Sequence, residues 1–201
     1  MKAAWFRSCG SALTWQSVIG LLGRGTRAGG VDYARSVVVR CTKKLLDLLG
    51  RSATRTEQPR GDDDWYANLL WIDRRKCLLL VHADTLFPVF RADVRVDELR
   101  PLSGYVVRAV EEELRAEGLP LDVLGPLDAD AVHIAKTASR SVLGSMNDMA
   151  FHLRYQIDYE GGLDVCDIRV LNQRQRRTLH NRNGVYAEPL DLVAGRLATR
   201  A

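Results

Sequence analysis

Two apolar segments, Trp65-Tyr-Ala-Asn-Leu-Leu-Trp-Ile-Asp73 and Lys76-Cys-Leu-Leu-Leu-Val-His82, decide the fold of this chain. Each is dominated by aromatic and aliphatic residues and has the length of a strand. The polar residues 73–76 suit a four-residue turn, which predicts an antiparallel hairpin. Because both segments carry apolar side chains on both faces, we expect this hairpin to lie centrally in a sheet that is covered on both sides.

The flanking sequence predicts the remaining elements. The segment 85–90 contains Pro88, which confines a strand to a sheet edge or a bulge. Thr42 and Asp164 are suitable helix N-caps, and Asn183-Gly184 marks a turn. We expect strands at 37–41, 85–90 and 131–136, and helices at 43–49, 101–117, 141–159, 164–176 and a short one from Pro189. This order predicts an α+β fold: a single domain whose mixed, mostly antiparallel sheet is packed by three to four helices.

The composition is that of an ordinary soluble protein. The chain has 201 residues, of which 46% are hydrophobic and 27% charged. No apolar run approaches the roughly 20 residues of a membrane span, so we expect no membrane partner. Four widely spaced cysteines without a Cys-x-x-Cys pair favour reduced thiols in a cytoplasmic protein, with no metal site and no cofactor. These are Cys9, Cys41, Cys77 and Cys166.

Residues 1–36 differ from the rest of the chain. They contain five basic residues against Asp32 alone, so they hold the whole formal net charge of +4. The balanced remainder gives no general argument for nucleic-acid binding. The segment lacks the clean apolar core of a signal peptide and fits a transit peptide only loosely. We interpret it as an extension from a start codon assigned too far upstream, with Val37 or Val38 as the native start and 37–201 as the domain.

Charge runs elsewhere have simple interpretations as solvated surface. The run 62–64 of three aspartates suits a solvated turn better than a cation site, and the run 111–113 of three glutamates suits the solvated side of a helix. The stretch 168–187 has no acidic residue, which would suit nucleic acid, although an exposed face or an acidic partner within the chain explains it more simply. Its basic residues are Arg169, Arg174, Arg176, Arg177 and Arg182.

The densest polar group lies where a strand is expected to run directly into a helix. Lys136 ends the strand, Arg140 lies in the turn and Ser141 begins the helix. The first backbone N–H groups of a helix lack carbonyl partners and carry partial positive charge, which suits an anion such as a phosphate. The small residue Ser145 would let a ligand approach closely. The alternative that stays open is that Ser141, or the serine two positions before it, only caps the helix.

The same helix places Ser145, Asp148 and His152 on one polar stripe, which invites comparison with a catalytic triad. Neighbours on one helix point outward in parallel, whereas a triad needs convergent side chains from separate elements. A helical pairing of Asp148 with His152 is the simpler interpretation. For an enzyme, Arg140, Asp148 and His152 are the candidate catalytic residues.

The chain also contains short blocks of distinctive sequence. They are Arg40-Cys-Thr-Lys-Lys-Leu-Leu, Asp64-Trp-Tyr-Ala-Asn-Leu, Arg74-Arg-Lys-Cys, Lys136-Thr, Arg140-Ser-Val-Leu-Gly-Ser-Met-Asn-Asp, and a late Tyr186 with Pro189. These blocks resemble a bacterial family of domains of unknown function over residues 38–195. The resemblance implies no known activity, but it implies that residues of these blocks form one recurring pattern. The ligand-binding candidates are Arg40, Lys43, Asn68, Lys136, Arg140, Ser141, Ser145 and Asn147, and Trp65 and Asp148 belong to the same pattern.

Two functions fit these features. The first is a binding or interaction module that recognises an anionic ligand or partner at the strand–helix junction, residues 136–148. The second is an enzyme that acts on nucleic acid or on a phosphorylated small molecule. An enzyme requires a concave pocket in which an acid or base with a shifted pKa lies beside hydrogen-bond donors.

Overall fold

The computed structural model describes residues 37–50, 59–182 and 184–200. The expected extension, residues 1–36, and residues 51–58 of the expected loop lie outside the described residues. The first half of the domain contains β1 (Val37–Cys41), α1 (Lys43–Leu49), β2 (Trp65–Ile72), β3 (Arg75–His82), β4 (Pro88–Arg91) and α2 (Leu102–Ala116). The second half contains β5 (Val132–Lys136), α3 (Arg140–Glu160), α4 (Ile168–Arg176), β6 (His180–Arg182), β7 (Val185–Ala187) and α5 (Pro189–Arg200).

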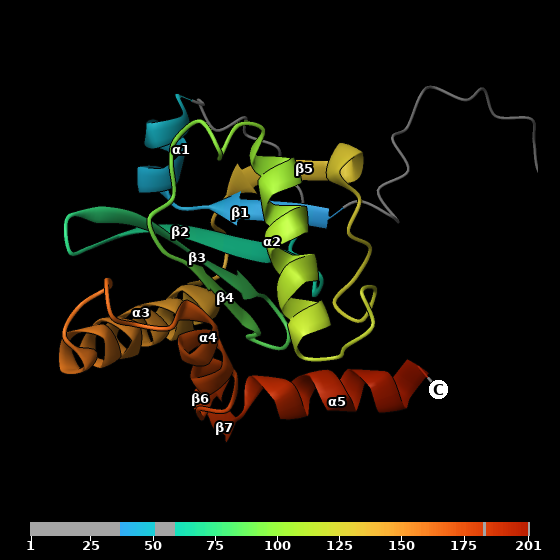
Figure 1. Ribbon diagram of the computed structural model, residues 1–201. Coiled ribbons are helices and arrows are strands. Elements are labelled where there is room, and N and C mark those ends of the chain that lie inside the picture. The colour runs from blue at the N-terminus through green and yellow to red at the C-terminus, as the bar shows by residue number, and fades with distance from the viewer. Residues whose placement is uncertain (1–36, 51–58, 183, 201) are drawn as a thin grey trace, which may run out of the picture. The chain divides into compact units, whose positions relative to one another are not determined.

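Strands β1 to β5 form one mixed sheet in the order β4-β3-β2-β1-β5 (Figure 1). Strand β1 runs parallel to both β2 and β5, whereas β2, β3 and β4 are antiparallel neighbours. A separate antiparallel hairpin joins β6 to β7. The α+β fold and the central hairpin are therefore confirmed, and Pro88 begins an edge strand as expected.

The turn of the central hairpin is shorter than expected. Ile72 lies opposite Arg75 in the register, so only Asp73 and Arg74 form the turn. Both have left-handed backbones, with φ of 48° and 62°, which is the conformation of a two-residue type I′ turn. The expectation of a four-residue turn was wrong because this turn lacks the Asn-Gly or Asp-Gly signal.

Two hydrophobic cores lie on opposite faces of the sheet. Buried side chains of α1 and α2, such as Leu45 and Val110, belong to one core, together with Val193 of α5. Buried side chains of α3 and α4, such as Met149 and Leu171, belong to the other. The sheet is thus covered on both sides, which explains why the hairpin strands are apolar on both faces. No helix of the described part of the chain is long and apolar enough to cross a membrane.

The start of α4 and the capping bond of α1 differ from expectation. Helix α4 begins later than expected, because Asp167 is its N-cap and accepts the Arg169 backbone N–H at 2.8 Å. Asp164 instead pairs with Arg75 across a distance of 2.6 Å. Thr42 occupies the N-cap position of α1, but its side chain makes no capping bond.

Candidate functional site

A cavity of about 170 Å³ lies beside the strand–helix junction and is called the junction cavity here. It is bounded by the loop before β2, the loop after β3, the first turns of α3, and β6. Four segments distant in sequence therefore meet at the N-terminal end of α3. The lining residues that carry polar side chains are Arg60, Asp62, Tyr66, Asp84, Ser139, Ser141, Ser145 and Arg182.

The start of α3 presents three serines to the junction cavity. Ser139 is the N-cap, and its hydroxyl accepts the backbone N–H of Val142 at 3.4 Å. Ser145 lies one turn further along and is buried, and its hydroxyl donates to the Asn181 carbonyl at 2.8 Å. Ser145 therefore ties β6 to α3, while Ser141 is exposed beside it.

A buried ion pair positions the loop on the opposite wall. The Arg40 side chain is buried in β1, and its Nε lies 2.5 Å from Oδ2 of Asp64. Its guanidinium also donates to the Pro59 carbonyl at 2.8 Å, and Asp64 accepts the Gly61 backbone N–H at 3.0 Å. Arg40 thus fixes both ends of the segment that carries Arg60 to the junction cavity. Asp64 belongs to this pair and not to a solvated turn, which corrects the interpretation of the aspartate run.

Tyr66 of β2 contributes a hydroxyl group to the junction cavity. Burial raises the pKa of this phenol above its ordinary value of 10, although the nearby Arg40 charge opposes the change. A hydrogen bond with the backbone of Ala138 places the hydroxyl at the loop that leads into α3. Because the raised pKa keeps the phenol protonated at neutral pH, Tyr66 offers a hydrogen-bond donor and not a base.

A second, wider hollow of about 640 Å³ adjoins the junction cavity and shares Asp62, Asp84 and Arg182 with it. Arg196 of α5 pairs with Asp63 and lies 3.2 Å from Asp84, and Arg182 pairs with the same Asp84. These ion pairs attach α5 and β6 to the loops before β2 and after β3. Arginines therefore neutralise Asp63 and Asp84, two of the acidic side chains of this hollow.

The ligand-binding candidates fall into three groups. Ser141 and Ser145 line the junction cavity, and Arg40 lies behind its wall. Lys136, Arg140 and Asn147 are exposed and do not line it. Lys43 pairs with Asp47 one turn along α1 at 2.6 Å, and Asn68 accepts the Thr42 hydroxyl at 3.1 Å. A role of these residues in binding stays a prediction, and the geometry adds Arg60, Tyr66 and Arg182.

The catalytic candidates do not converge. Asp148 is exposed and His152 is half-buried, and neither lines the junction cavity. The ring centroids of His152 and His180 lie 6.3 Å apart. Among the described residues, His152 makes no hydrogen bond with Asp148. Within the described ranges, no cluster of three or more His, Cys, Asp or Glu residues could hold a metal ion.

The basic stretch 168–187 is largely neutralised within the chain. Arg174 pairs with Glu160, Arg177 with Glu117 at 2.8 Å, and Arg182 with Asp84. The interpretation that acidic partners within the chain explain this stretch is therefore correct for most of its arginines.

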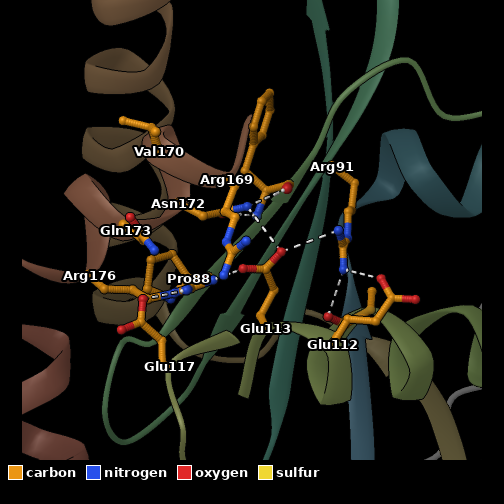
Figure 2. Close-up of polar contacts among 12 residues, drawn as sticks. Pro88, Arg91, Glu112, Glu113, Glu117, Arg169, Val170, Asn172, Gln173 and Arg176 are labelled. Atoms are coloured by element: carbon orange, nitrogen blue, oxygen red, sulfur yellow. Dashed lines mark hydrogen bonds and ion pairs between the residues drawn. The ribbon is translucent and has the colours of Figure 1, made fainter. Parts of the chain in front are cut away.

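Arg176 is the most deeply buried of these arginines, and Figure 2 shows its surroundings. Its guanidinium pairs with Glu113 and with Glu117, the latter at 2.8 Å, and lies 4.7 Å above the Phe87 ring. Its Nε also donates to the Pro88 carbonyl at 3.3 Å. Glu113 is thus part of a buried network, which corrects its assignment to the solvated side of the helix.

Asn172 completes this network at the edge of the sheet (Figure 2). Its amide accepts the Phe90 backbone N–H at 2.7 Å and donates to the Phe90 carbonyl at 2.9 Å. The side chain therefore occupies backbone hydrogen-bonding groups of β4, as a neighbouring strand would. This contact protects the exposed edge of the sheet from pairing with other chains. We assign the network of Glu113, Asn172 and Arg176 a structural role.

His82 lies beneath the ion pairs that hold α5. It is fully buried, its Nδ1 lies 3.0 Å from the Thr85 hydroxyl, and its Nε2 lies 3.9 Å from Asp63. Burial, reinforced by the charge of Arg196, lowers the pKa of His82 from 6.5 to about 3. The histidine is therefore neutral in the folded protein at physiological pH.

This pKa predicts a loss of stability in acid. Between pH 6.5 and about 3 the unfolded chain binds a proton at His82 that the folded chain does not. The free energy of unfolding should therefore fall with falling pH by up to about 1.4 kcal/mol per pH unit, on the order of 5 kcal/mol in all. Urea unfolding of the wild type and of His82→Asn over this range measures the contribution. An equally steep pH dependence in both proteins would contradict it.

The chain matches a known family over most of its length. A family model described as a domain of unknown function, DUF6933, matches residues 38–192. The match covers the five-stranded sheet, the junction cavity and the start of α5, and it leaves out residues 1–36. No curated protein matches the chain.

Proposed function

We propose that this chain, which belongs to the family of domains of unknown function DUF6933, is a binding module for an anionic ligand that it holds in the junction cavity. The observation that carries the proposal is the convergence of Arg60, Arg182 and the N-terminal end of α3 on one small cavity. Asp62 and Asp84 also line this cavity, and Asp84 pairs with Arg182, so Arg60 and the start of α3 supply the positive charge that a ligand meets. The arginines come from segments that are more than a hundred residues apart, so only folding brings them together.

The polar groups of the junction cavity suit an oxyanion. The N-terminal end of α3 carries partial positive charge, because its first N–H groups lack helical carbonyl partners. Ser141 and Tyr66 add hydroxyl groups at the same wall. Among the residues that the structure describes, Arg60 has no acidic partner in an ion pair. Lys136 and Arg140 add exposed positive charge at the strand–helix junction.

The size of the junction cavity limits the ligand. Pockets for drug-sized molecules usually enclose about 300–1,000 Å³. A volume of about 170 Å³ therefore suits a phosphate-sized group, either free or at the end of a larger molecule. A larger ligand would extend toward the adjoining hollow, since the two share Arg182 and Asp84.

The chemistry of the site favours binding over catalysis. Burial moves the pKa of Tyr66, which lines the cavity, further above neutral pH. A general base needs a pKa near the working pH and a position within reach of the substrate. His82 and His180 are buried outside the junction cavity. These observations support a module more than an enzyme.

Titration with anions tests the proposal. Inorganic phosphate, a nucleoside monophosphate and a short single-stranded oligonucleotide are added to the wild type, and the melting temperature and the binding heat are measured. We expect phosphate or the monophosphate to stabilise the protein at millimolar concentration. Charge-assisted hydrogen bonds contribute about 1.5–3 kcal/mol, so Arg60→Ala should weaken binding about tenfold or more. Arg140→Ala tests the contribution of the exposed cation at the start of α3.

The matched control is Arg108→Ala, which removes an exposed arginine of α2 that does not line the junction cavity. Its affinity should equal that of the wild type. If no anion binds at millimolar concentration, or if Arg60→Ala and Arg108→Ala bind equally well, the junction is only a capped helix start. A response to the oligonucleotide alone would favour nucleic acid as the partner.

A further inference from the structure

The outward face of α3 carries a stripe of exposed aromatic side chains. Phe151, Tyr155 and Tyr159 are 67%, 65% and 82% exposed, and they follow each other at intervals of four residues. Residues at this spacing lie on one face of a helix. The rings of Tyr155 and Tyr159 stack on each other, with centroids 6.5 Å apart. Exposed aromatic side chains that gather on one face are a common feature of interaction surfaces.

Charged side chains of alternating sign flank this stripe. In chain order they are Arg140, Asp148, Arg154 and Asp158. None of the four makes an ion pair with another described residue. The arginines Arg91, Arg174 and Arg196, by contrast, all have acidic partners within the chain. The face therefore holds two cations and two anions that no described neighbour neutralises.

We propose that this face of α3 binds the same face of a second copy of the chain, with the two helices antiparallel and a twofold axis near Phe151. When the twofold axis passes through residue 151, a residue that follows 151 by a given number of positions faces the partner residue that precedes 151 by the same number. Asp148 then faces the partner's Arg154, and Arg154 faces the partner's Asp148. The two Phe151 rings meet at the axis, so that apolar surface is buried in the centre and charges lie at its rim.

A glycine on the same face fits this arrangement. Gly144 lies seven residues before Phe151, and a Cβ atom built on it would have no neighbour within 4 Å. The axis places it opposite the partner's Asp158 and beside the partner's Tyr159. Small residues let two helices approach closely, and the open surface above Gly144 leaves room for the partner's tyrosine ring.

The charge pattern decides between possible occupants. A polyanion such as nucleic acid requires an excess of positive charge, but this face has equal numbers of arginines and aspartates. Of the four charges, Asp148 and Arg154 face opposite charges when the second helix runs antiparallel about residue 151. A second copy supplies that partner without any further component.

Sedimentation of the full chain between about 1 and 200 μM tests the proposal. We expect a monomer–dimer equilibrium in the wild type. Arg154→Glu and Asp148→Lys each place like charges opposite each other twice per dimer, so each should weaken dimerisation about tenfold or more. The double variant Asp148→Lys/Arg154→Glu restores opposite charges and should recover most of the affinity. Lys44→Glu is the matched control, because it reverses an exposed cation of α1.

Each other outcome overturns the proposal. A wild type that stays monomeric at 200 μM rules out the dimer. A dimer that Arg154→Glu and Asp148→Lys leave unchanged uses another face. Weakening by both single variants without recovery in the double variant excludes the antiparallel pairing of residues 148 and 154. Equal weakening by Lys44→Glu shows that only the net charge matters.

Discussion

Replacing Arg176 with alanine should lower the free energy of unfolding by about 3–5 kcal/mol. The arginine is fully buried and pairs with both Glu113 and Glu117. Its removal leaves the buried carboxylate of Glu113 with fewer charged partners, and uncompensated buried charges are costly. The loss of packing on Phe87 adds to the effect. Urea unfolding followed by circular dichroism measures the change.

Arg174→Ala provides the matched control on the same helix. Arg174 is 52% exposed and pairs with Glu160 at the surface. Exposed ion pairs contribute about 0.2–1 kcal/mol, so this variant should remain close to the wild type. If both variants lose the same stability, the network around Glu113 does not hold α4 against the sheet.

Replacing Leu79 with aspartate should lower the free energy of unfolding by about 4 kcal/mol or more. In a marginally stable chain this loss prevents cooperative folding. Leu79 is fully buried in β3 and packs in the core beneath α3. The substitution removes apolar volume and places an unpaired carboxylate among apolar side chains. The fraction of soluble protein and the midpoint of urea unfolding measure this effect.

Trp71→Asp tests whether the burial of the side chain, and not the new charge in the hairpin, causes the loss of stability. Trp71 lies in β2 of the same hairpin, but its side chain is 54% exposed. We expect this variant to lose about 1 kcal/mol and to fold cooperatively. Cooperative folding of Leu79→Asp with near wild-type stability would refute the central placement of the hairpin.

The fold was predictable where local composition alone determines the element. The apolar segments 65–72 and 76–82 have no polar face, so a covered central hairpin was the consistent solution. Details that depend on tertiary contacts were not predictable. Asp164 and Asp167 are equally good caps by residue type, and the pairing of Asp164 with Arg75, 89 residues away, is absent from the local sequence.

The burial of two arginines was the main feature that could not be predicted from the sequence. Arg40 and Arg176 are 2% and 0% exposed, yet residue type alone places arginine at the surface. Each is buried because acidic partners accompany it, Asp64 for Arg40 and Glu113 for Arg176. Such pairs join segments that are far apart in the chain, so the local periodicity of the sequence does not predict them.

The candidate site was predictable in its helical half only. Ser141 and Ser145 follow directly from the expected start of a helix after a strand. Arg60, Tyr66 and Arg182 reach the junction cavity from three other elements, so the sequence offered no local reason to join them to the serines. The alternation of β2 gave the one usable signal, because Tyr66 lies on the same face as Leu70, in the core of α3.

A phosphate titration followed by amide nuclear magnetic resonance is the most direct test for an anion site in the junction cavity. We expect inorganic phosphate to shift the backbone N–H signals of residues 139–142 and 60–62 with one common dissociation constant in the millimolar range or below. In Arg60→Ala the same shifts should require about tenfold more phosphate. Absence of shifts at these residues, or shifts spread over all exposed lysines and arginines, would contradict an anion site in the junction cavity.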